Sequence, residues 1–309
     1  MRRQTGSARS MPAREASWEL FEAFLAVMRG GSLSAASRAL SLTQPTVRRR
    51  IEELEAALQV VLFTRAPNGL VPTEAATSTV HHAESMAASA LALGRAVSAP
   101  KDAARGTVRV AVSEIMGVEV LPPLLAALLA RHPGLQVELV LSNRNEDLLR
   151  RDADVAVRMI EPTQAALVAR KAGVVQVGLY ASKAYLARRP APKKLDELRA
   201  HALVGSDRAR GLLDVLVEAG IPLRPRDFGF RSDSDVAQLA AVRAGMGVGV
   251  CQVPLAAGSP DLVRVLPRVS VDLGMWIVTH EDLRDTARIR LMTDHLHAAL
   301  GRYSRGGGQ

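Results

Sequence analysis

Apolar side chains recur every three or four positions across residues 44–58, at Val47, Ile51, Leu54 and Leu58. This spacing predicts an amphipathic helix with a single buried stripe. Thr43 can cap the start of that helix, and Pro45 suits its first turn because the N–H that proline lacks has no partner there. Since successive residues lie about 100° apart around a helix, the stripe leaves Arg49 pointing directly away from the core.

The segments on either side of this helix predict a helix-turn-helix with a wing. Residues 18–29 predict a first helix, with core side chains at Leu20, Phe21, Phe24, Leu25 and Met28. A second helix follows, and it carries small residues that allow a close crossing at Ala35, Ala36 and Ala39. Residues 62–73 predict two short strands that turn at residues 67–69, with Arg65 at their base, within reach of a phosphate.

The exposed face of the central helix offers groups that bind DNA. Its side chains are Gln44, Thr46, Arg48 and Arg49. These residues supply the donors and acceptors that read base edges and phosphates in the major groove. Arginines among glutamates are on their own more typical of a solvated surface. The capped break before the helix and the wing after it favour DNA binding instead.

Residues 74–99 predict a long helix without proline. Small or apolar residues recur along it at spacings of three and four, at Val80, Ala83, Ala87, Ala90, Gly94 and Val97. Such a seam suits a helix that lies closely against a partner. The following stretch, 99–106, is polar and interrupted by Pro100 and Gly106, so it is expected to be a hinge.

Alternating strand and helix patterns after the hinge predict an α/β domain with a mostly parallel sheet. The expected strands are residues 107–112, 135–141, 154–158, 174–181, 202–204, 227–231, 248–253 and 275–279. The expected helices are residues 118–131, 146–150, 211–219, 235–244 and 286–300.

Composition narrows the class of partner. A formal charge of +9 favours an anionic partner, and the helix-turn-helix pattern indicates that this partner is double-stranded DNA. A single cysteine, Cys251, excludes an internal disulfide framework and fits a reducing cytoplasm. Residues 1–17 are basic and polar, so we expect a disordered extension rather than a secretory signal. No apolar run reaches the roughly 18 residues of a spanning helix, so no membrane role is expected.

Together these motifs resemble the winged helix-turn-helix of LysR-type transcriptional regulators. The resemblance lies in Phe24, Gly31-Ser32-Leu33-Ser34-Ala35-Ala36, Thr43-Gln44-Pro45, Arg49-x-Ile51-x-x-Leu54-Glu55, Leu62-Phe63-x-Arg65 and Thr73-Glu74. Three positions depart from the family pattern: Arg48 replaces a common serine, Gln59 replaces the glycine that usually ends the helix, and Ala76 replaces a frequent glycine. The expected DNA-binding residues are Ser34, Thr43, Gln44, Pro45, Thr46, Arg48, Arg49 and Arg65.

Later segments extend the resemblance to the LysR effector-binding domain, through residues 152–158, 178–186 and 244–254. The resemblance implies two α/β subdomains of the type 2 periplasmic-binding-protein kind, joined by two crossovers, with a cleft between them for a small-molecule effector. It also implies a homodimer paired through the linker helix, working as that dimer or as a homotetramer, and a transcriptional regulator rather than an enzyme.

The domain boundaries follow from the motifs and the resemblance together. A disordered extension spans 1–17, the winged helix-turn-helix 18–75, the linker helix and hinge 76–106, and the effector-binding domain 107–309. Within that last domain, subdomain I spans about 107–178 and 268–309, and subdomain II spans about 179–267.

Open α/β sheets bind ligands beyond the carboxyl ends of strands, where helix N-termini offer free N–H groups. The expected effector-binding residues are Ser113, Glu114, Ile115, Arg158, Ser206, Ser232, Ser234 and Gln252. Ser234 is equally well explained as a helix cap, because a cap and a ligand donor need the same geometry. An unpaired Glu114 would favour an effector with an amine or hydroxyls over an anion, whereas a salt bridge to Arg158 would cancel that preference.

Other kinds of site are weaker. Gly245-x-Gly247-x-Gly249 stands between a helix and a strand, the reverse of a dinucleotide loop, so a tight turn and no cofactor are expected. His295 and His297 are misphased for chelation on a helix, so no metal is expected. Two rival functions stay open. A transport-type solute receptor needs an export signal, and an enzyme with an accessory DNA-binding head needs a catalytic constellation.

Overall fold

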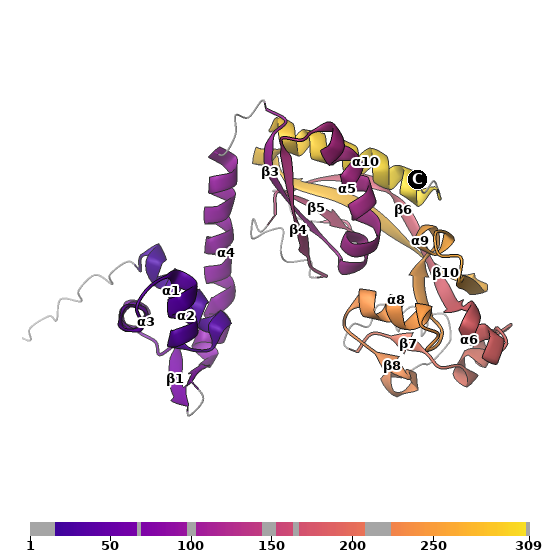
Figure 1. Ribbon diagram of the computed structural model, residues 1–309, viewed down its shortest axis with the longest axis horizontal. Helices are drawn as coiled ribbons and strands as arrows, with labels where there is room; N and C mark the ends of the chain where they lie inside the picture. The colour runs from indigo at the N-terminus through magenta and orange to yellow at the C-terminus, as the bar shows by residue number, and fades with distance from the viewer. Residues whose placement is uncertain are drawn as a thin grey trace, which may run out of the picture. The chain divides into compact units, whose positions relative to one another are not determined.

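The computed structural model describes residues 16–66, 69–97, 103–143, 153–162, 167–207 and 224–306. The chain divides into two compact units, one ending at Leu91 and the other starting at Ala92 (Figure 1). Some expected features lie outside the described residues: nearly all of the N-terminal extension, the wing tip at 67–68, and the helices at 146–150 and 211–219.

Helices and a two-stranded wing form the N-terminal unit. The helices are α1 (Trp18–Gly30), α2 (Leu33–Leu40) and α3 (Gln44–Leu58), and the wing strands are β1 (Phe63–Ala66) and β2 (Gly69–Pro72). The two strands pair antiparallel, with Thr64 opposite Val71. These elements confirm the predicted winged helix-turn-helix.

The core of this unit follows the predicted stripe of α3 for most of its length. Phe24 of α1 and Val47 and Leu54 of α3 are fully buried, and Ile51 is 5% exposed. Leu58 was expected to continue the stripe, and that expectation is wrong because its side chain is 37% exposed. The helix ends at Leu58, so its last turn extends past the core.

The close crossing of α1 and α2 uses two of the three predicted alanines and a glycine that was not predicted. Of the alanines expected at the contact, Ala36 is fully buried but Ala39 is exposed. The approach is closest at Gly30, where an added Cβ would lie 2.8 Å from the Cβ of Ala35. The absence of a side chain at Gly30 therefore allows the close approach together with the alanines of α2.

Each of these three helices ends on a residue in the left-handed region: Gly31 at φ 66°, Ser41 at φ 54° and Gln59 at φ 56°. The backbone N–H of Gln59 donates to the carbonyl of Glu55, which closes α3. A non-glycine residue in this conformation costs roughly 1–2 kcal/mol. Gln59 thus ends the helix at the position where the LysR pattern has glycine, and it does so under strain.

A long helix, α4 (Glu74–Val97), follows the wing and confirms the predicted helix. The first part of its expected partner seam, Val80, Ala83 and Ala87, packs instead in the core of the N-terminal unit. The hydroxyl of Thr73 accepts from the backbone N of Ala76 at 3.2 Å and donates to the carbonyl of Val61 at 2.8 Å. This residue therefore ties the start of α4 to the loop before the wing. Near the end of the helix, Leu91 and Leu93 are 61% and 66% exposed.

The C-terminal unit is built on a sheet with the strand order β4-β3-β5-β10-β6-β9. Its strands are β3 (Gly106–Val112), β4 (Leu135–Leu141), β5 (Val155–Arg158), β6 (Leu167–Ser182), β9 (Gly249–Gln252) and β10 (Leu262–His280). β3 pairs parallel with β4 and β5. β10 pairs antiparallel with β5 and β6, and β6 pairs antiparallel with β9. The expected mostly parallel sheet is therefore wrong beyond the first three strands.

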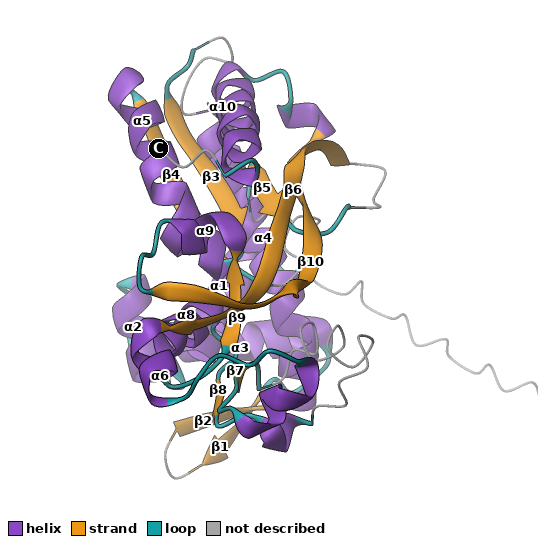
Figure 2. Ribbon diagram, turned by 90° about the vertical axis from the view of Figure 1, so that its right-hand side faces the viewer, coloured by secondary structure: helices purple, strands orange, loops and turns teal. Residues whose placement is uncertain are grey.

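Two long strands, β6 and β10, run side by side through the domain (Figure 2). The sequence predicted only residues 174–181 and 275–279 of them. Their pairing shifts register between Val265 and Ser270 and again between Met275 and Trp276. Such bulges interrupt the two-residue alternation from which strands are predicted, so only the regular parts were found.

Helices cover the part of this sheet built on β3, β4 and β5, which we call the first lobe. They are the π-helical turn η1 (Met116–Val120), α5 (Leu121–Arg131) and α10 (Ala287–Ser304), preceded by the 3-10 turn η5 (Glu281–Leu283). Met116, Leu121, Met275 and Met292 are fully buried together in its core. No helix within the described residues has the length and apolar character needed to span a lipid bilayer.

The other end of the long strands carries smaller elements around β9, which we call the second lobe. They are α6 (Lys183–Arg188), η3 (Leu195–Ala200), β7 (Val204–Gly205), η4 (Pro225–Asp227), β8 (Phe230–Arg231), α8 (Asp235–Arg243) and α9 (Val253–Ala257). β7 and β8 form a short parallel pair, so both strands are shorter than predicted. The five-residue α9 was not expected, because so short a helix shows little periodicity.

Replacing Gln59 with glycine should raise the free energy of unfolding of the N-terminal unit by about 0.5–1 kcal/mol, because glycine adopts a positive φ without the strain of a Cβ. Urea denaturation followed by Trp18 fluorescence, in a Trp276→Phe background, measures this. As a control, Ala56→Gly on the exposed side of α3 should lower stability by about 1 kcal/mol. A Gln59→Gly variant no more stable than its parent would contradict the strain.

Candidate functional site

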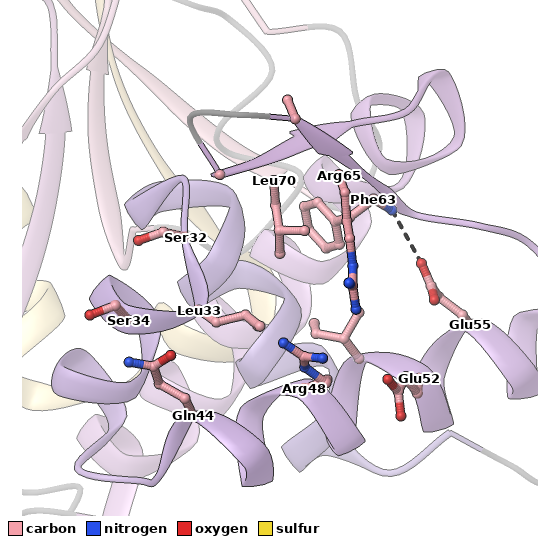
Figure 3. Close-up of a pocket in the computed structure, with 13 residues that line it drawn as sticks. Ser32, Leu33, Ser34, Gln44, Arg48, Glu52, Glu55, Phe63, Arg65 and Leu70 are labelled. Atoms are coloured by element: carbon pink, nitrogen blue, oxygen red, sulfur yellow. Dashed lines mark hydrogen bonds between the residues drawn. The ribbon is translucent and has the colours of Figure 1, made fainter.

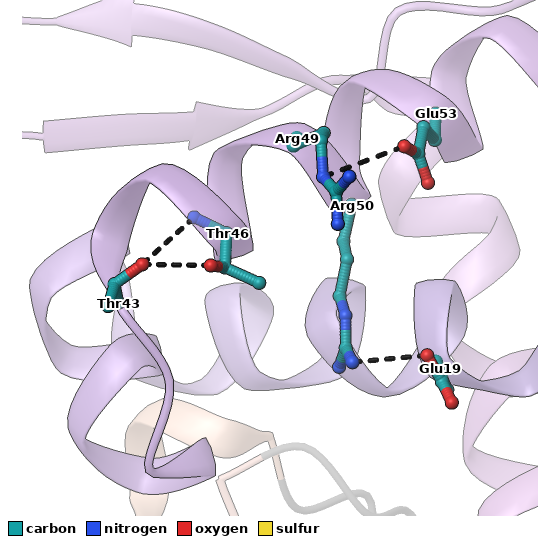
Figure 4. A network of polar contacts seen from close by, with 6 residues as sticks. All are labelled: Glu19, Thr43, Thr46, Arg49, Arg50 and Glu53. Atoms are coloured by element: carbon teal, nitrogen blue, oxygen red, sulfur yellow. Dashed lines mark hydrogen bonds and ion pairs between the residues drawn. The ribbon is translucent and has the colours of Figure 1, made fainter.

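The N-terminus of α3 is fixed by its cap and leaves its polar side chains exposed. The Thr43 hydroxyl accepts from the backbone N of Thr46 at 3.4 Å, and the two hydroxyls lie 2.8 Å apart (Figure 4). Gln44, Pro45 and Arg48 are exposed in the first turns. The predicted cap is confirmed, and these three side chains are exposed to solvent rather than packed in the core.

The consecutive arginines of α3 have different environments. The Arg50 guanidinium bonds Glu19 of α1 at 3.1 Å, and its side chain is only 18% exposed (Figure 4). Arg49 is 70% exposed and lies 3.7 Å from Glu53 one turn along. A contact this open contributes little stability. Arg50 therefore joins two helices, whereas Arg49 keeps its charge at the surface, as the helical phase predicted.

A hollow of about 420 Å³ lies between α2, α3 and the wing (Figure 3). Half of the residues predicted to bind DNA line it: Ser34, Gln44, Arg48 and Arg65. The others, which do not line it, are Thr43, Pro45, Thr46 and Arg49. Arg48 enters from α3 and Arg65 from β1, so two cationic side chains from different elements share one concave surface.

Two acidic side chains share this wall, and one of them is bonded to the backbone of the wing. Glu52 and Glu55 both line the hollow. The Glu55 carboxylate accepts from the backbone N of Leu62 at 2.7 Å and of Phe63 at 3.1 Å. Glu55 therefore ties α3 to the first wing strand. The sequence motif includes Glu55 but does not predict this role. Leu62 and Phe63 come near the carboxylate only because the chain turns after α3.

Backbone contacts set the second wing strand against the start of α2. The N–H of Leu70 donates to the carbonyl of Gly31 at 3.3 Å. A Cβ on Gly69 would lie 2.9 Å from that same carbonyl oxygen, and Gly69 has a φ of 132°, so glycine is required there.

Two serines lie at the start of α2. Ser32 caps the helix, with its hydroxyl 3.2 Å from the backbone N of Ala35. Ser34, predicted to bind DNA, accepts from Arg38 at 2.8 Å.

In the C-terminal unit the structure brings together two groups of predicted effector residues from different lobes. Glu114 follows β3 in the first lobe, and Ser234 caps α8 in the second. The Ser234 hydroxyl donates to the Glu114 carboxylate at 2.7 Å and accepts from the N of Ala237 at 3.3 Å. Ser232 lies beside them, accepting from the N of Ser234 at 3.2 Å. Ser234 thus serves as a cap and bonds a carboxylate at once.

A second polar link crosses between the lobes at the same place. The Asn143 side chain accepts from the N of Glu114 at 3.1 Å and donates to Asp235 at 3.3 Å. Burial raises the pKa of Asp235, and the negative charge of Glu114 raises it further, while the hydrogen bond from Asn143 opposes both. Asn143 was not among the predicted site residues, since nothing in the sequence places it beside the start of α8.

The alternative in which Glu114 forms a salt bridge with Arg158 is not seen among the described residues. Arg158 is 5% exposed and donates to the carbonyl of Ser142 at 3.0 Å. It thereby fixes the segment that carries Asn143. Ser113 and Ile115 flank Glu114, and the Ser113 Oγ is buried with no hydrogen-bond partner in the described part of the chain.

The remaining predicted effector residues are placed apart from this contact. Ser206 directly follows β7. Gln252 is 6% exposed and lies where the lobes meet. Its amide nitrogen contacts the Met116 sulfur at 3.4 Å, and its oxygen accepts from the Tyr303 hydroxyl at 2.6 Å. Gln252 is therefore already bonded on both sides, and Tyr303 is a partner that the sequence did not reveal.

The far end of α8 is held by an ion pair. Arg243 bonds both carboxylate oxygens of Glu119, at 2.7 Å and 2.8 Å. The hydrogen bond from Arg243 lowers the pKa of Glu119. Bidentate pairs of this kind combine strength with a fixed geometry. The second lobe is thus connected to the first lobe at both ends of α8, through Glu114 and Asn143 at its start and through Glu119 of η1 at its end.

Among the described residues, neither the cysteine nor the potential metal ligands form a reactive site. Burial raises the pKa of the Cys251 thiol to about 12, which leaves it protonated and unreactive near neutral pH. Among the described residues, no group of three or more His, Cys, Asp or Glu side chains could hold a metal ion.

Two family models match the chain. The model described as "LysR substrate binding domain" matches residues 101–301, and the model described as "Bacterial regulatory helix-turn-helix protein, lysR family" matches residues 18–77. The first match covers the predicted effector-binding domain, and the second covers the predicted winged helix-turn-helix.

Individual relatives agree with the family models. An HTH-type transcriptional regulator of Xanthomonas campestris pv. campestris is 31% identical over 189 residues, which are 61% of this chain and 55% of that protein. The HTH-type transcriptional activator AaeR of Escherichia coli is 28% identical over 233 residues, 75% of each chain.

Solved structures show the same fold. CbnR, a LysR family transcriptional regulator, has a TM-score of 0.66 at 21% identity, covering 95% of this chain and 100% of that one. Full-length CbnR complexed with its target DNA has a TM-score of 0.65 at 21% identity, covering 92% of this chain and 99% of that one.

Glu55→Ala should lower the free energy of unfolding of the N-terminal unit by about 2 kcal/mol, because two backbone donors lose a charged acceptor. Denaturation followed by Trp18 fluorescence measures the change. Glu53→Ala, which removes an exposed carboxylate from the same helix, should change stability by less than about 0.5 kcal/mol. Equal losses in the two variants would show that Glu55 does not hold the wing.

Proposed function

The chain belongs to the LysR family of bacterial transcriptional regulators, and from that premise we propose that it reads DNA with the hollow between α3 and the wing. As a member of this family it is a DNA-binding transcriptional regulator with an effector-binding domain, and not an enzyme. The observation that carries the proposal is the convergence of Gln44, Arg48 and Arg65 on one concave surface.

Within this surface we assign different tasks to different side chains. Arg49, Arg65 and Arg48 contact phosphates, because guanidinium groups on two elements can follow the backbone on both sides of a groove. Gln44, Pro45 and Thr46 carry base discrimination, since they stand at the N-terminus of the helix that enters the major groove. Ser34 and Thr43 position these contacts from the start of α2 and the cap of α3.

We further propose that the molecule is a homodimer paired through α4, which assembles into a homotetramer. The exposed apolar side chains Met86, Leu93 and Val97 support pairing, because at about 100° per residue they fall on one face of this helix and an exposed apolar face is costly in water. A two-fold dimer would present two copies of α3 to two half-sites whose spacing its own geometry sets.

The proposed division of the chain is a DNA-binding domain at 18–75, a linker at 76–106 and an effector-binding domain at 107–309. Separate apolar clusters support the split of that last domain, one around β3 and α10 and others around α6 and α8. The division into 107–178 with 268–309, and 179–267, places the boundary on the two long strands.

The proposed effector site lies between the lobes. Its residues are Ser113, Glu114, Ile115, Arg158, Ser206, Ser232, Ser234 and Gln252. An effector that binds one arrangement of the lobes better than another would shift the population of that arrangement and so change binding to DNA. With Glu114 and Asp235 both facing this place, the site favours an effector with an amine or hydroxyls over an anion.

Gln44→Ala should change the sequence preference of binding more than its salt dependence, and Arg65→Ala should do the reverse. Loss of one phosphate contact lowers the slope of log K against log salt by about one, whereas loss of a base contact costs about 1–3 kcal/mol on the preferred sequence only. Quantitative binding at several salt concentrations, on selected and scrambled DNA, separates the two effects. Arg284→Ala, on an exposed turn of the C-terminal unit, is the control and should change neither.

If Gln44→Ala and Arg65→Ala both weakened binding to all sequences alike with unchanged salt slopes, the assignment of these roles would be wrong.

A further inference from the structure

A second hollow, of about 480 Å³, lies on the second lobe. One wall is residues 193–195, at the start of η3, and the other is residues 266–270, in the middle of β10. None of the residues of the proposed effector site lines it. This hollow is therefore a feature of the second lobe by itself and not of the contact between the lobes.

A strained bulge of β10 forms one wall of the hollow. The pairing with β6 shifts register between Val265 and Ser270, so residues 266–269 bulge out of the ladder. Leu266 begins this bulge with a φ of 48°, although it is only 9% exposed. A leucine in the left-handed region costs roughly 1–2 kcal/mol, and backbone strain of this kind gathers at functional sites.

The buried part of the lining is apolar. Leu266 belongs to the core of the second lobe, and Leu195 and Val269 are partly buried against that core. A ligand in the hollow would cover these three side chains and remove apolar surface from water. The volume falls within the roughly 300–1,000 Å³ of small-molecule sites.

The exposed part of the lining is cationic. Lys193, Lys194 and Arg268 are exposed, and no described residue that lines the hollow is acidic. Glu197, which does not line it, accepts from the backbone N of Lys193 at 2.7 Å and so fixes the turn that carries both lysines. This hydrogen bond lowers the pKa of Glu197, as do the charges of the two lysines. Arg268 forms no ion pair with any residue in the described part of the chain.

We propose that this hollow binds a small carboxylic acid with an apolar body, as a ligand site separate from the effector site between the lobes. The acid group lies between Arg268 and the two lysines, and the body lies on Leu195, Leu266 and Val269. A guanidinium fork matches a carboxylate in two parallel hydrogen bonds, and the lysines add charge without a fixed geometry. A single negative charge suits the site, because Glu197 already faces the lysines.

The alternative is that the bulge only bends β10 and that the cations only keep the surface hydrated. The two accounts differ in the molecule that the hollow prefers. A binding site holds a molecule with an acid group and an apolar body more tightly than one with either part alone, whereas a hydrated bend has no such preference.

The test is a titration of the full-length protein with 4-phenylbutyrate, followed by the methyl NMR signals of leucine, isoleucine and valine. We expect saturable shifts at Leu195, Leu266 and Val269. Acetate, which lacks the body, and 4-phenylbutanol, which lacks the charge, should each bind about tenfold more weakly or less. Ile115, in the proposed effector site, should not shift.

Charge variants show whether the cations hold the acid. Lys193→Gln, Lys194→Gln and Arg268→Gln combined should weaken 4-phenylbutyrate about tenfold, and Arg268→Gln alone about threefold. Methyl spectra of the free variants that match the native spectrum away from the hollow confirm that the fold is retained. Lys183→Gln removes an exposed cation of α6 that does not line the hollow, and it should leave the binding unchanged.

These titrations contain no DNA, so their outcome does not bear on the proposed DNA-reading surface. Equal binding of 4-phenylbutyrate and 4-phenylbutanol would overturn the proposal, as would full affinity in the triple variant. Shifts confined to Ile115 would also overturn it, because the acid would then lie between the lobes.

Discussion

Two hydrogen bonds from the backbone of the wing to the Glu55 carboxylate are the contact on which the proposed DNA-reading surface depends. They join α3 to β1 directly, at 2.7 Å and 3.1 Å. Without them the strand that carries Arg65 would have no hydrogen bond to α3 among the described residues, although the Leu70–Gly31 bond would still hold the wing to the start of α2. With them Arg48 and Arg65 line one hollow, and the Glu55 carboxylate on the same wall is hydrogen-bonded to the backbone of the wing.

The C-terminal unit applies the same kind of constraint across a larger distance. The long strands β6 and β10 connect its lobes, and α8 meets the first lobe at both of its ends, through Ser234 with Glu114 and through Arg243 with Glu119. The arrangement of the lobes is therefore tied to polar contacts at the proposed effector site. A ligand that changes those contacts acts on the arrangement directly, as regulation by population shift requires.

Local sequence rules predicted the features that depend on near neighbours. The cap at Thr43, the buried stripe through Val47 and Leu54, the cap at Ser234 and the long α4 all follow from spacings of three or four residues. The same rules failed at ends and irregularities. Leu58 is exposed because a period does not say where the core stops, and most of β10 was missed because bulges break its alternation. Distant pairings, such as Glu114 with Ser234 or Arg50 with Glu19, have no signature in the local pattern, so the sequence could nominate Glu114 and Ser234 but not join them.

The most direct measurement is a hydroxyl-radical footprint of the full-length protein on DNA fragments selected for tight binding from the genome of its source. The proposed two-fold dimer would present two copies of α3, so it predicts protection at two half-sites related by a two-fold axis, with centres about 10–10.5 base pairs or a multiple of that apart. Protection should weaken at both half-sites in Arg48→Ala, since the hollow of each subunit loses one of the two arginines, Arg48 and Arg65, that line it. Protection without two-fold symmetry, or one that Arg48→Ala leaves unchanged, would contradict the account of how this chain reads DNA.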